Sequence, residues 1–123
     1  MKITSQDFVK ELFQFQLELK MYHWQTFKHP RHKATDELMS ELLEFIDLFV
    51  EAYMGKYRRV ETLPNIELRK NITDRNAVSK LINPFASFLK KWKKDLKDED
   101  EFINLIEELQ IEVEKTKYLM TLS

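Results

Sequence analysis

Apolar residues recur at three- and four-residue spacing in four separate segments of the chain, which is the pattern of helices with one buried face. In residues 5–24 the main stripe comprises Phe8, Leu12, Phe15, Leu19 and Tyr22. Thr4 and Ser5 precede it, and both are residue types that favour the N-cap position. The pattern predicts a first helix over residues 5–24.

A second helix is predicted from about residue 30 to residue 54 or 57. Pro30 suits its first turn, where a missing N–H costs nothing, and His29 is interpreted as a loop or N-cap residue. Apolar side chains nearly encircle this segment: Leu38, Met39, Leu42, Leu43, Phe45, Ile46, Phe49, Val50 and Tyr53. We therefore expect a helix that is buried on several sides.

Residues 55–71 contain Pro64 and no helical period, and they form a longer connection than a tight helical hairpin needs. A third helix, capped by Thr73 or Asp74, is predicted through residue 92, with Pro84 either kinking it or marking a restart capped by Asn83. A fourth is predicted over about residues 102–119. The sequence thus predicts one all-α domain over residues 1–123, a four-helix bundle with a long crossover between its second and third helices.

Composition narrows the chemistry. Hydrophobic residues make up 43% and charged residues 33%, and the net charge of -1 gives no general attraction for nucleic acid. The Lys-rich run around Trp92 is better explained by a core Trp with lysines near a helix end. Without cysteine, any metal must be held by oxygen and imidazole. Neither a signal peptide nor a membrane span is apparent, so a cytoplasmic, intracellular protein is expected.

Four residues of types that bind metals share one face of the second predicted helix. At about 100° per residue, His32, Asp36, Asp47 and Glu51 fall at roughly 0°, 40°, 60° and 100°. They form two pairs at i,i+4 spacing, His32 with Asp36 and Asp47 with Glu51. The pairs lie roughly 16 Å apart along the axis, too far for one ion to be bound by both pairs of one chain.

Two copies of this helix packed antiparallel about a two-fold axis would bring the pairs together, because the His32 end of one chain would then lie against the Glu51 end of the other. A homodimer is the commonest symmetric assembly, and it would hold two identical shared sites. His23, near the end of the first predicted helix and just before the short loop that leads to the second, can reach the site from the His32 side. Such mixed imidazole and carboxylate ligation suits Fe(II), and also Mn(II) or Zn(II). No His lies three residues after a Glu, so an intrachain ferritin di-iron motif is not expected.

The adjacent His23 and Trp24, followed by His32, Asp36, Asp47 and Glu51 with spacings of four, eleven and four, resemble the ferroxidase motif of Dps-type mini-ferritins. The resemblance implies a ferritin-like four-helix bundle in which Fe(II) is oxidised by hydrogen peroxide or oxygen at sites between subunits. It also implies that His23, His32, Asp36, Asp47 and Glu51 are metal ligands and that Trp24 intercepts oxidising equivalents.

The sequence of residues 23–57 also resembles that of small ferritin-like proteins encoded by phages and large DNA viruses, which implies an infected host cell as the setting. Assembly of such dimers into a larger shell is an alternative that the sequence leaves open. The chain is smaller than a typical Dps subunit, and the gap between His23 and His32 is shorter than in that family. No lysine-rich tail precedes the first helix, so tail-mediated DNA binding is not expected.

An alternative without metal stays open. Asp47 and Glu51 lie among apolar residues and need a cation if they are buried, and a partner chain's Arg or Lys could supply it. The protein would then be a non-enzymatic helical homodimer or an interaction protein that retains the fold without redox chemistry.

Overall fold

The computed structural model describes residues 2–61, 65–69 and 71–122. Four long helices account for most of them: α1 (Ser5–Gln25), α2 (His29–Lys56), α3 (Asn83–Leu96) and α4 (Asp100–Leu119). A single π-helical turn, η1 (Val78–Ile82), leads into α3. The described residues contain no strand, and the prediction of an all-helical chain is confirmed.

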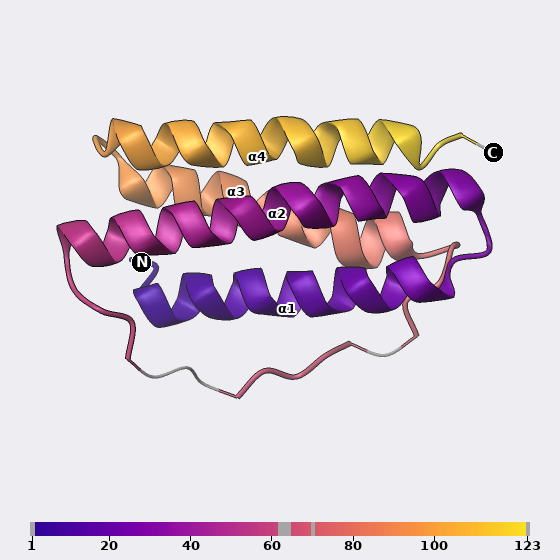
Figure 1. Cartoon of the computed structure of the whole chain (residues 1–123), viewed down its shortest axis with the longest axis horizontal. Helices are drawn as coiled ribbons and strands as arrows, with labels where there is room; N and C mark the ends of the chain where they lie inside the picture. Colours follow the sequence, from indigo (N-terminus) through magenta and orange to yellow (C-terminus); the bar gives the residue numbers. More distant parts are fainter. Residues whose placement is uncertain (1, 62–64, 70, 123) are drawn as a thin grey trace.

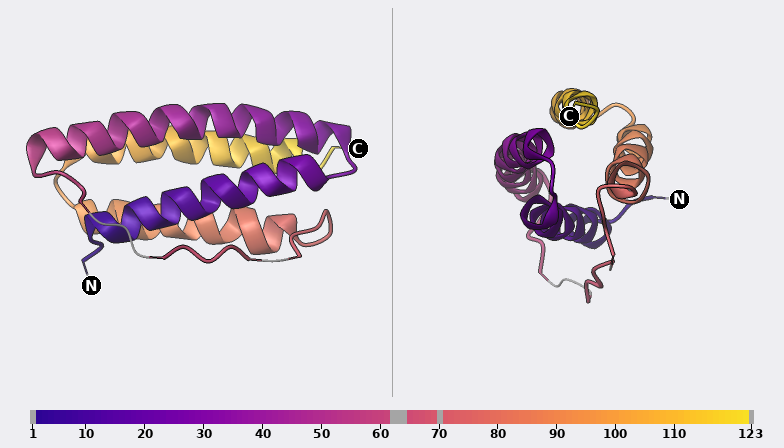
Figure 2. Two further views of the ribbon diagram at one scale, coloured as in Figure 1. Left: turned by 60° about the horizontal axis from the view of Figure 1, so that its bottom comes forward. Right: turned by 90° about the vertical axis from the view of Figure 1, so that its right-hand side faces the viewer.

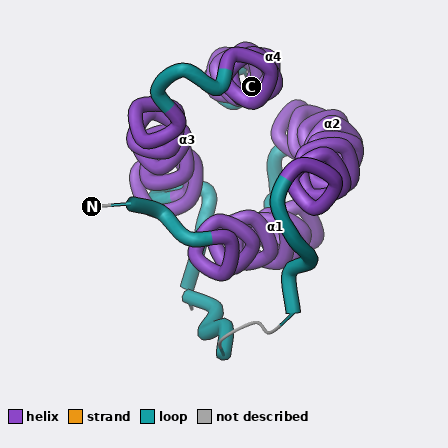
Figure 3. Tube along the Cα trace, turned by 90° about the vertical axis from the view of Figure 1, so that its left-hand side faces the viewer, coloured by secondary structure: helices purple, strands orange, loops and turns teal. Residues whose placement is uncertain are grey.

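The four helices lie alongside one another around a common core (Figures 1 and 2). Viewed along their axes, the helices form a ring in which α2 lies between α1 and α4, and α3 lies opposite α2, between α4 and α1 (Figure 3). The described part of the connection from α2 to η1 passes along the outside of α1, where the Gln14 amide donates a hydrogen bond to the Glu67 carbonyl. Its middle, residues 62–64, and residue 70 lie outside the described residues, so the predicted crossover falls partly on them.

The core is rich in aromatic side chains. Phe8 stacks on Trp92 with ring centroids 4.9 Å apart, and Phe49 lies 4.4 Å from the same indole. Phe15 stacks on Phe85 at 3.8 Å. Trp92 is almost completely buried, which confirms that the lysine-flanked Trp belongs to the core. Burial of such large rings dominates the energetics of a small core.

The helix starts follow local hydrogen bonding. Thr4 caps α1 through a reciprocal capping box, in which its hydroxyl accepts from the Asp7 N–H and the Asp7 carboxylate accepts from the Thr4 N–H. Lys28 occupies the N-cap position of α2, and His29 is the first helical residue, which places Pro30 in the first turn as predicted.

An α-helix starts at Asn83 with Pro84 in its first turn, which agrees with the predicted restart, but Asn83 does not cap it: Ile82 holds the N-cap position and makes no side-chain cap hydrogen bond. The backbone is helical from η1 into α3, and the Asn83 N–H bonds to the Val78 carbonyl, five residues back, which defines the π-helical turn. Proline lacks the N–H that would continue the α-helical ladder, so the irregularity lies in the turn directly before it.

The predicted cap of the third helix is also wrong. Neither Thr73 nor Asp74 caps it with a side chain; the Asn76 amide oxygen accepts from the Thr73 N–H, and the Asn76 amide group donates to the Asn71 carbonyl. The Asp74 carboxylate points to the end of α1 instead, because three hydrogen-bond donors meet there.

A buried ion pair ties the connection to α1. Glu18, with only 1% of its surface exposed, accepts from the Arg69 Nη2 at 2.6 Å and from the Arg69 backbone N–H at 2.7 Å. A carboxylate in the interior needs such partners. Among the described residues, no helix is long and apolar enough to cross a membrane.

Candidate metal centre

Two histidines lie face to face where α1 ends and α2 begins. His23 is in the last turn of α1, and His32 is in the first turns of α2. The short loop between the helices brings their rings to a centroid distance of 3.9 Å with an interplanar angle of 21°. His23 is buried, with 7% exposed, whereas His32 is exposed to solvent. The structure therefore brings together two of the five predicted ligands.

Both rings are held through Nδ1. The Nδ1 of His32 lies 3.0 Å from the His23 carbonyl oxygen, which can only accept, so this nitrogen carries the proton. The Nδ1 of His23 lies 3.0 Å from Thr35 Oγ1. The Thr35 hydroxyl in turn donates to the Arg31 carbonyl at 2.8 Å, so the His23 Nδ1 is the donor here too. With the proton on Nδ1, the lone pair of a neutral imidazole lies on Nε2, which is the arrangement that metal-binding histidines use.

Burial favours the neutral form of His23. Desolvation lowers the pKa of His23 below its ordinary value, and the neighbouring charge of His32 lowers it further. A hydrogen bond from the His23 ring to the His32 backbone and the charge of Asp36 act in the opposite direction without reversing the shift. His23 is therefore available as a neutral ligand near pH 7.

The three predicted carboxylates lie on the surface of the single chain. Asp36, Asp47 and Glu51 are exposed along the α2 stripe that begins at His32. The expectation that Asp47 and Glu51 need a cation because they are buried is not met in one chain. In the described part of the chain, no three His, Cys, Asp or Glu side chains come close enough to hold one metal ion. The two ends of the stripe stay apart, in line with their separation along the helix.

Apolar side chains accompany the stripe. Leu43, between the two pairs, is 51% exposed, so the helix that was predicted to be buried on several sides leaves this apolar side chain open to solvent in one chain. Asp47 and Glu51 line a groove of about 520 Å³ between α1 and α2, whose walls include Phe13 and Val50. The carboxylates of this pair therefore border an apolar depression open to solvent.

Trp24 lies on the surface of α1 next to His23 in sequence. Its side chain is 68% exposed, and the Lys20 ammonium lies 5.7 Å from its ring centroid. Leu17 lies on the same face of α1 as Trp24 and is 46% exposed. The α1 surface beside the stripe thus also presents apolar groups to solvent.

A polar network that the sequence did not reveal supports the loop between the two histidines. Asp74 accepts from the Tyr22 hydroxyl at 2.6 Å, from the Thr26 hydroxyl at 2.5 Å and from the Phe27 N–H at 3.0 Å. Buried Arg31 donates to the Tyr22 oxygen, to the Asp74 carbonyl and, from its Nε, to the carbonyl of Met120 beyond α4.

The ionisation of Asp74 follows from these contacts. Burial alone would raise the pKa of Asp74, but the hydrogen bonds from Thr26, Tyr22 and the Phe27 backbone, with the charge of Arg31, bring it below its usual range. Burial raises the pKa of Tyr22, so its hydroxyl keeps the proton that it donates. Asp74 is 48 residues from Thr26 in sequence, and no spacing rule joins them.

No curated protein and no solved structure shows a significant match to the chain. A family model described as "Family of unknown function (DUF5856)" matches residues 23–120, a span that begins at His23 and contains all five predicted ligands. The chain belongs to this family.

Proposed function

We propose that this protein binds Fe(II) and oxidises it with hydrogen peroxide or oxygen, at two sites shared between the subunits of a two-fold homodimer. The observation that carries the proposal is the histidine pair. His23 and His32 lie side by side, each with an oxygen atom at Nδ1 and, among the described residues, no hydrogen-bond partner at Nε2.

The fold that best accommodates this site is a ferritin-like four-helix bundle. Support comes from the order of the helices around the core and from the long connection, which returns along α1 before α3 begins (Figure 1). This arrangement leaves one face of α1 and α2 open beside the ligand stripe. It is the face on which a second copy would pack.

The open face supports a dyad near the middle of α2. Leu43 lies between the two ligand pairs, and Leu17 and Trp24 extend the exposed apolar surface onto α1. An antiparallel second copy would cover these side chains and bring its Asp47 and Glu51 to the first subunit's His32. Burial of apolar area at roughly 25 cal/mol per Å² supplies the driving force for such a contact.

The donor set fits the proposed substrate. His23 and His32 supply two imidazoles, and Asp36 with the partner's Asp47 and Glu51 would supply three carboxylates, a mixture suited to Fe(II) and, as competitors, to Mn(II) and Zn(II). Two Fe(II) ions give one electron each to one hydrogen peroxide molecule, whose O–O bond breaks as it takes up two protons from solvent and becomes two water molecules. The carboxylates favour the more highly charged Fe(III) product, and Trp24 beside the site would intercept stray oxidising equivalents.

The test is anaerobic Fe(II) titration of the metal-free dimer by calorimetry, followed by addition of peroxide under optical detection. Asp47→Ala/Glu51→Ala should bind no iron and show no accelerated ferric absorbance. Glu37→Ala/Glu41→Ala is the matched control, because it removes two exposed carboxylates with the same spacing from the same helix. Equal behaviour of the two double variants would refute the assignment.

Complementation tests whether the site is shared. A heterodimer of the Asp47→Ala/Glu51→Ala chain and an Asp36→Ala chain has one intact site and one that is damaged on both sides. After random exchange of an equimolar mixture, about half of the dimers are heterodimers with one of two sites intact, so mixing the two inactive variants should recover about a quarter of the wild-type binding capacity. Absence of any recovery after subunit exchange has been verified would exclude a shared site.

A second candidate is a non-enzymatic helical homodimer or interaction protein. It is favoured by the exposure of Asp36, Asp47 and Glu51, which need no cation while water solvates them. Metal dependence of the dimer's Tm separates the candidates, because a ligand that binds only the folded state raises its stability. A Tm unchanged by Fe(II) or Zn(II) would favour the second candidate.

A further inference from the structure

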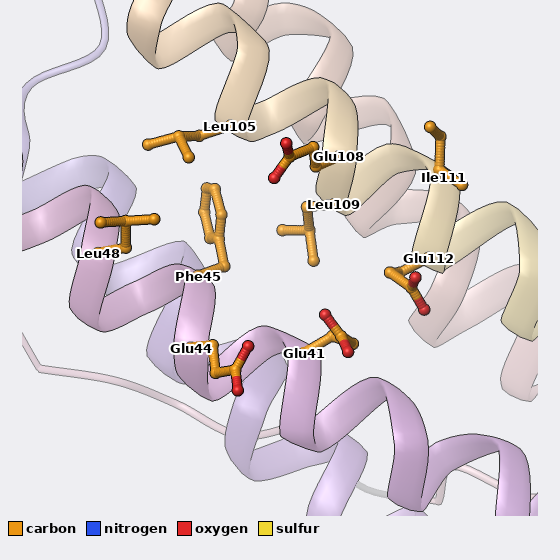
Figure 4. A pocket seen from close by; sticks show the side chains of 9 residues that line it. All are labelled: Glu41, Glu44, Phe45, Leu48, Leu105, Glu108, Leu109, Ile111 and Glu112. Atoms are coloured by element: carbon orange, nitrogen blue, oxygen red, sulfur yellow. The ribbon is translucent and has the colours of Figure 1, made fainter.

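A second groove lies between α2 and α4 and shares no lining residue with the groove beside Asp47 and Glu51. Figure 4 shows it from close by, with side chains of α2 on one wall and of α4 on the other. Its volume is about 320 Å³. We call it the acidic groove, defined by its glutamates Glu41, Glu44, Glu108 and Glu112.

The charge of the acidic groove is of one sign. Each wall contributes two of the four carboxylates, and all other lining residues are apolar. Lys115 pairs with Glu37 at 3.8 Å, but neither residue lines the groove. Four carboxylates at a shallow depression produce a negative potential that attracts cationic partners.

The surface between the carboxylates is apolar and accessible. Leu48 on α2 is 55% exposed and Ile111 on α4 is 67% exposed, whereas Phe45 forms part of the floor and is almost buried. Exposed aliphatic side chains grouped in a concave site are typical of surfaces that bind another apolar group. The acidic groove therefore combines apolar contact area with a charged rim, as protein interfaces commonly do.

We propose that the acidic groove docks a basic amphipathic helix of another protein. Residues 41–48 of α2 cover about two helical turns, or roughly 10 Å at 1.5 Å per residue. A docked helix would place apolar side chains at i, i+3 or i+4 and i+7 against Leu48, Phe45 and Ile111. Its flanking Lys or Arg residues would pair with the four glutamates. This inference is independent of the proposed iron chemistry.

A second copy of this chain fits the acidic groove less well. The basic surface of α3 contains Lys90, Lys91 and Lys94 and matches the charge of the groove. However, none of the large hydrophobic residues exposed on the described chain lies on α3. Such a surface would satisfy the carboxylates but leave Leu48 and Ile111 uncovered. Anionic lipid is disfavoured by the same carboxylates.

The test uses a fluorescein-labelled helical peptide of leucine and lysine, with leucines on one face, and measures its binding to the full chain by fluorescence anisotropy. A peptide with the same leucines but glutamate for lysine is the control for charge. Leu48→Ala/Ile111→Ala and Glu44→Gln/Glu108→Gln alter the acidic groove at exposed positions, where folding is insensitive to substitution. Glu67→Gln/Glu114→Gln makes the same change in net charge elsewhere on the exposed surface.

The lysine peptide should bind, and each change in the acidic groove should weaken its binding about tenfold at low ionic strength, while the Glu67/Glu114 control stays within about twofold. Amide NMR shifts on peptide addition should map to residues 41–48 and 105–112. No binding of the lysine peptide, or equal weakening by both glutamate pairs, would overturn the proposal. So would self-association of the free protein that Leu48→Ala/Ile111→Ala abolishes, because the groove would then belong to a second copy.

Discussion

Replacing Thr35 with valine isolates the role of the histidine pair from that of the fold. Thr35 is completely buried, and its hydroxyl accepts the Nδ1 proton of His23 while donating to the Arg31 carbonyl. Valine has nearly the same shape and the same branching at Cβ, so packing is preserved. The substitution therefore removes one hydroxyl group and leaves the His23 ring in place without its partner.

The expected magnitude follows from two separate losses. A buried Nδ1–H without an acceptor costs about 1–3 kcal/mol of folding free energy. His23 can escape this cost by moving its proton to Nε2, which is the atom required for metal binding. Losing such a supporting hydrogen bond weakens metal affinity about 10–100-fold. That range equals about 1.4–2.7 kcal/mol of binding free energy.

Thr116→Val is the matched control. Thr116 is also buried, at 3% exposed, and its hydroxyl donates to the Glu112 carbonyl four residues back, as Thr35 does to Arg31. It has no histidine partner. Anaerobic Fe(II) titration of both variants, with urea unfolding of each metal-free protein, separates loss of affinity from loss of stability.

Thr35→Val should lose iron affinity, whereas Thr116→Val should bind iron as the wild type does after correction for its stability. If Thr35→Val binds Fe(II) with wild-type affinity, the hydroxyl does not set the tautomer of His23. Equal losses in both variants would instead attribute the effect to the helix backbone.

Three further outcomes are expected from contacts elsewhere in the chain. Asp74→Asn should destabilise the protein by about 1–3 kcal/mol at pH 7, because it weakens charge-assisted hydrogen bonds. Since the folded-state pKa of Asp74 is lowered, its contribution is present above the unfolded value near 3.8 and lost as pH falls through the folded value. Urea unfolding should show the variant and wild type converging in acid, and a constant gap would contradict this. Glu18→Gln should cost about 1–3 kcal/mol because it leaves the partly exposed Arg69 without its carboxylate, and hydrogen exchange should rise around residues 65–69. Dimer formation should blue-shift the fluorescence of exposed Trp24 but not of buried Trp92, so Trp24→Phe should abolish a concentration-dependent shift.

Hydrophobic spacing predicted the helices because each has a buried stripe whose period is visible in the sequence. The boundaries of α1 and α2 agree with the predicted ones to within a few residues. The region from Thr73 to Pro84 was predicted less well, for two reasons. The side chain of Asn76, and not that of Thr73, makes the hydrogen bond that holds this turn, by accepting from the Thr73 N–H. The backbone responds to Pro84 with a π-helical turn before it, which single-residue propensities do not distinguish from a kink.

In the site, too, contacts between residues close in sequence could be predicted, and contacts between distant residues could not. The pairing of His32 with Asp36 follows from helical spacing alone, and the approach of His23 to His32 follows from a loop of only a few residues. Thr35, as the partner of His23, was within reach of such reasoning, because it lies three residues after His32 on the side of α2 that faces α1. The contacts of Asp74 were not, because they depend on where a long connection returns to the end of α1.

The surplus of apolar residues around α2 carries the remaining argument. The sequence predicted a helix that is buried on several sides. In one chain, α2 contributes Leu38, Leu42 and Phe49 to the core and exposes Leu43 and Leu48 on two different faces. Leu43 lies between the two ligand pairs, and Leu48 lines the acidic groove. A helix that contacts neighbours on three sides needs apolar residues on three sides, and one chain supplies neighbours for only part of its circumference. The excess hydrophobicity of α2 is therefore accounted for if a second copy covers Leu43 and another protein covers Leu48, which connects the two proposals to a single property of the sequence.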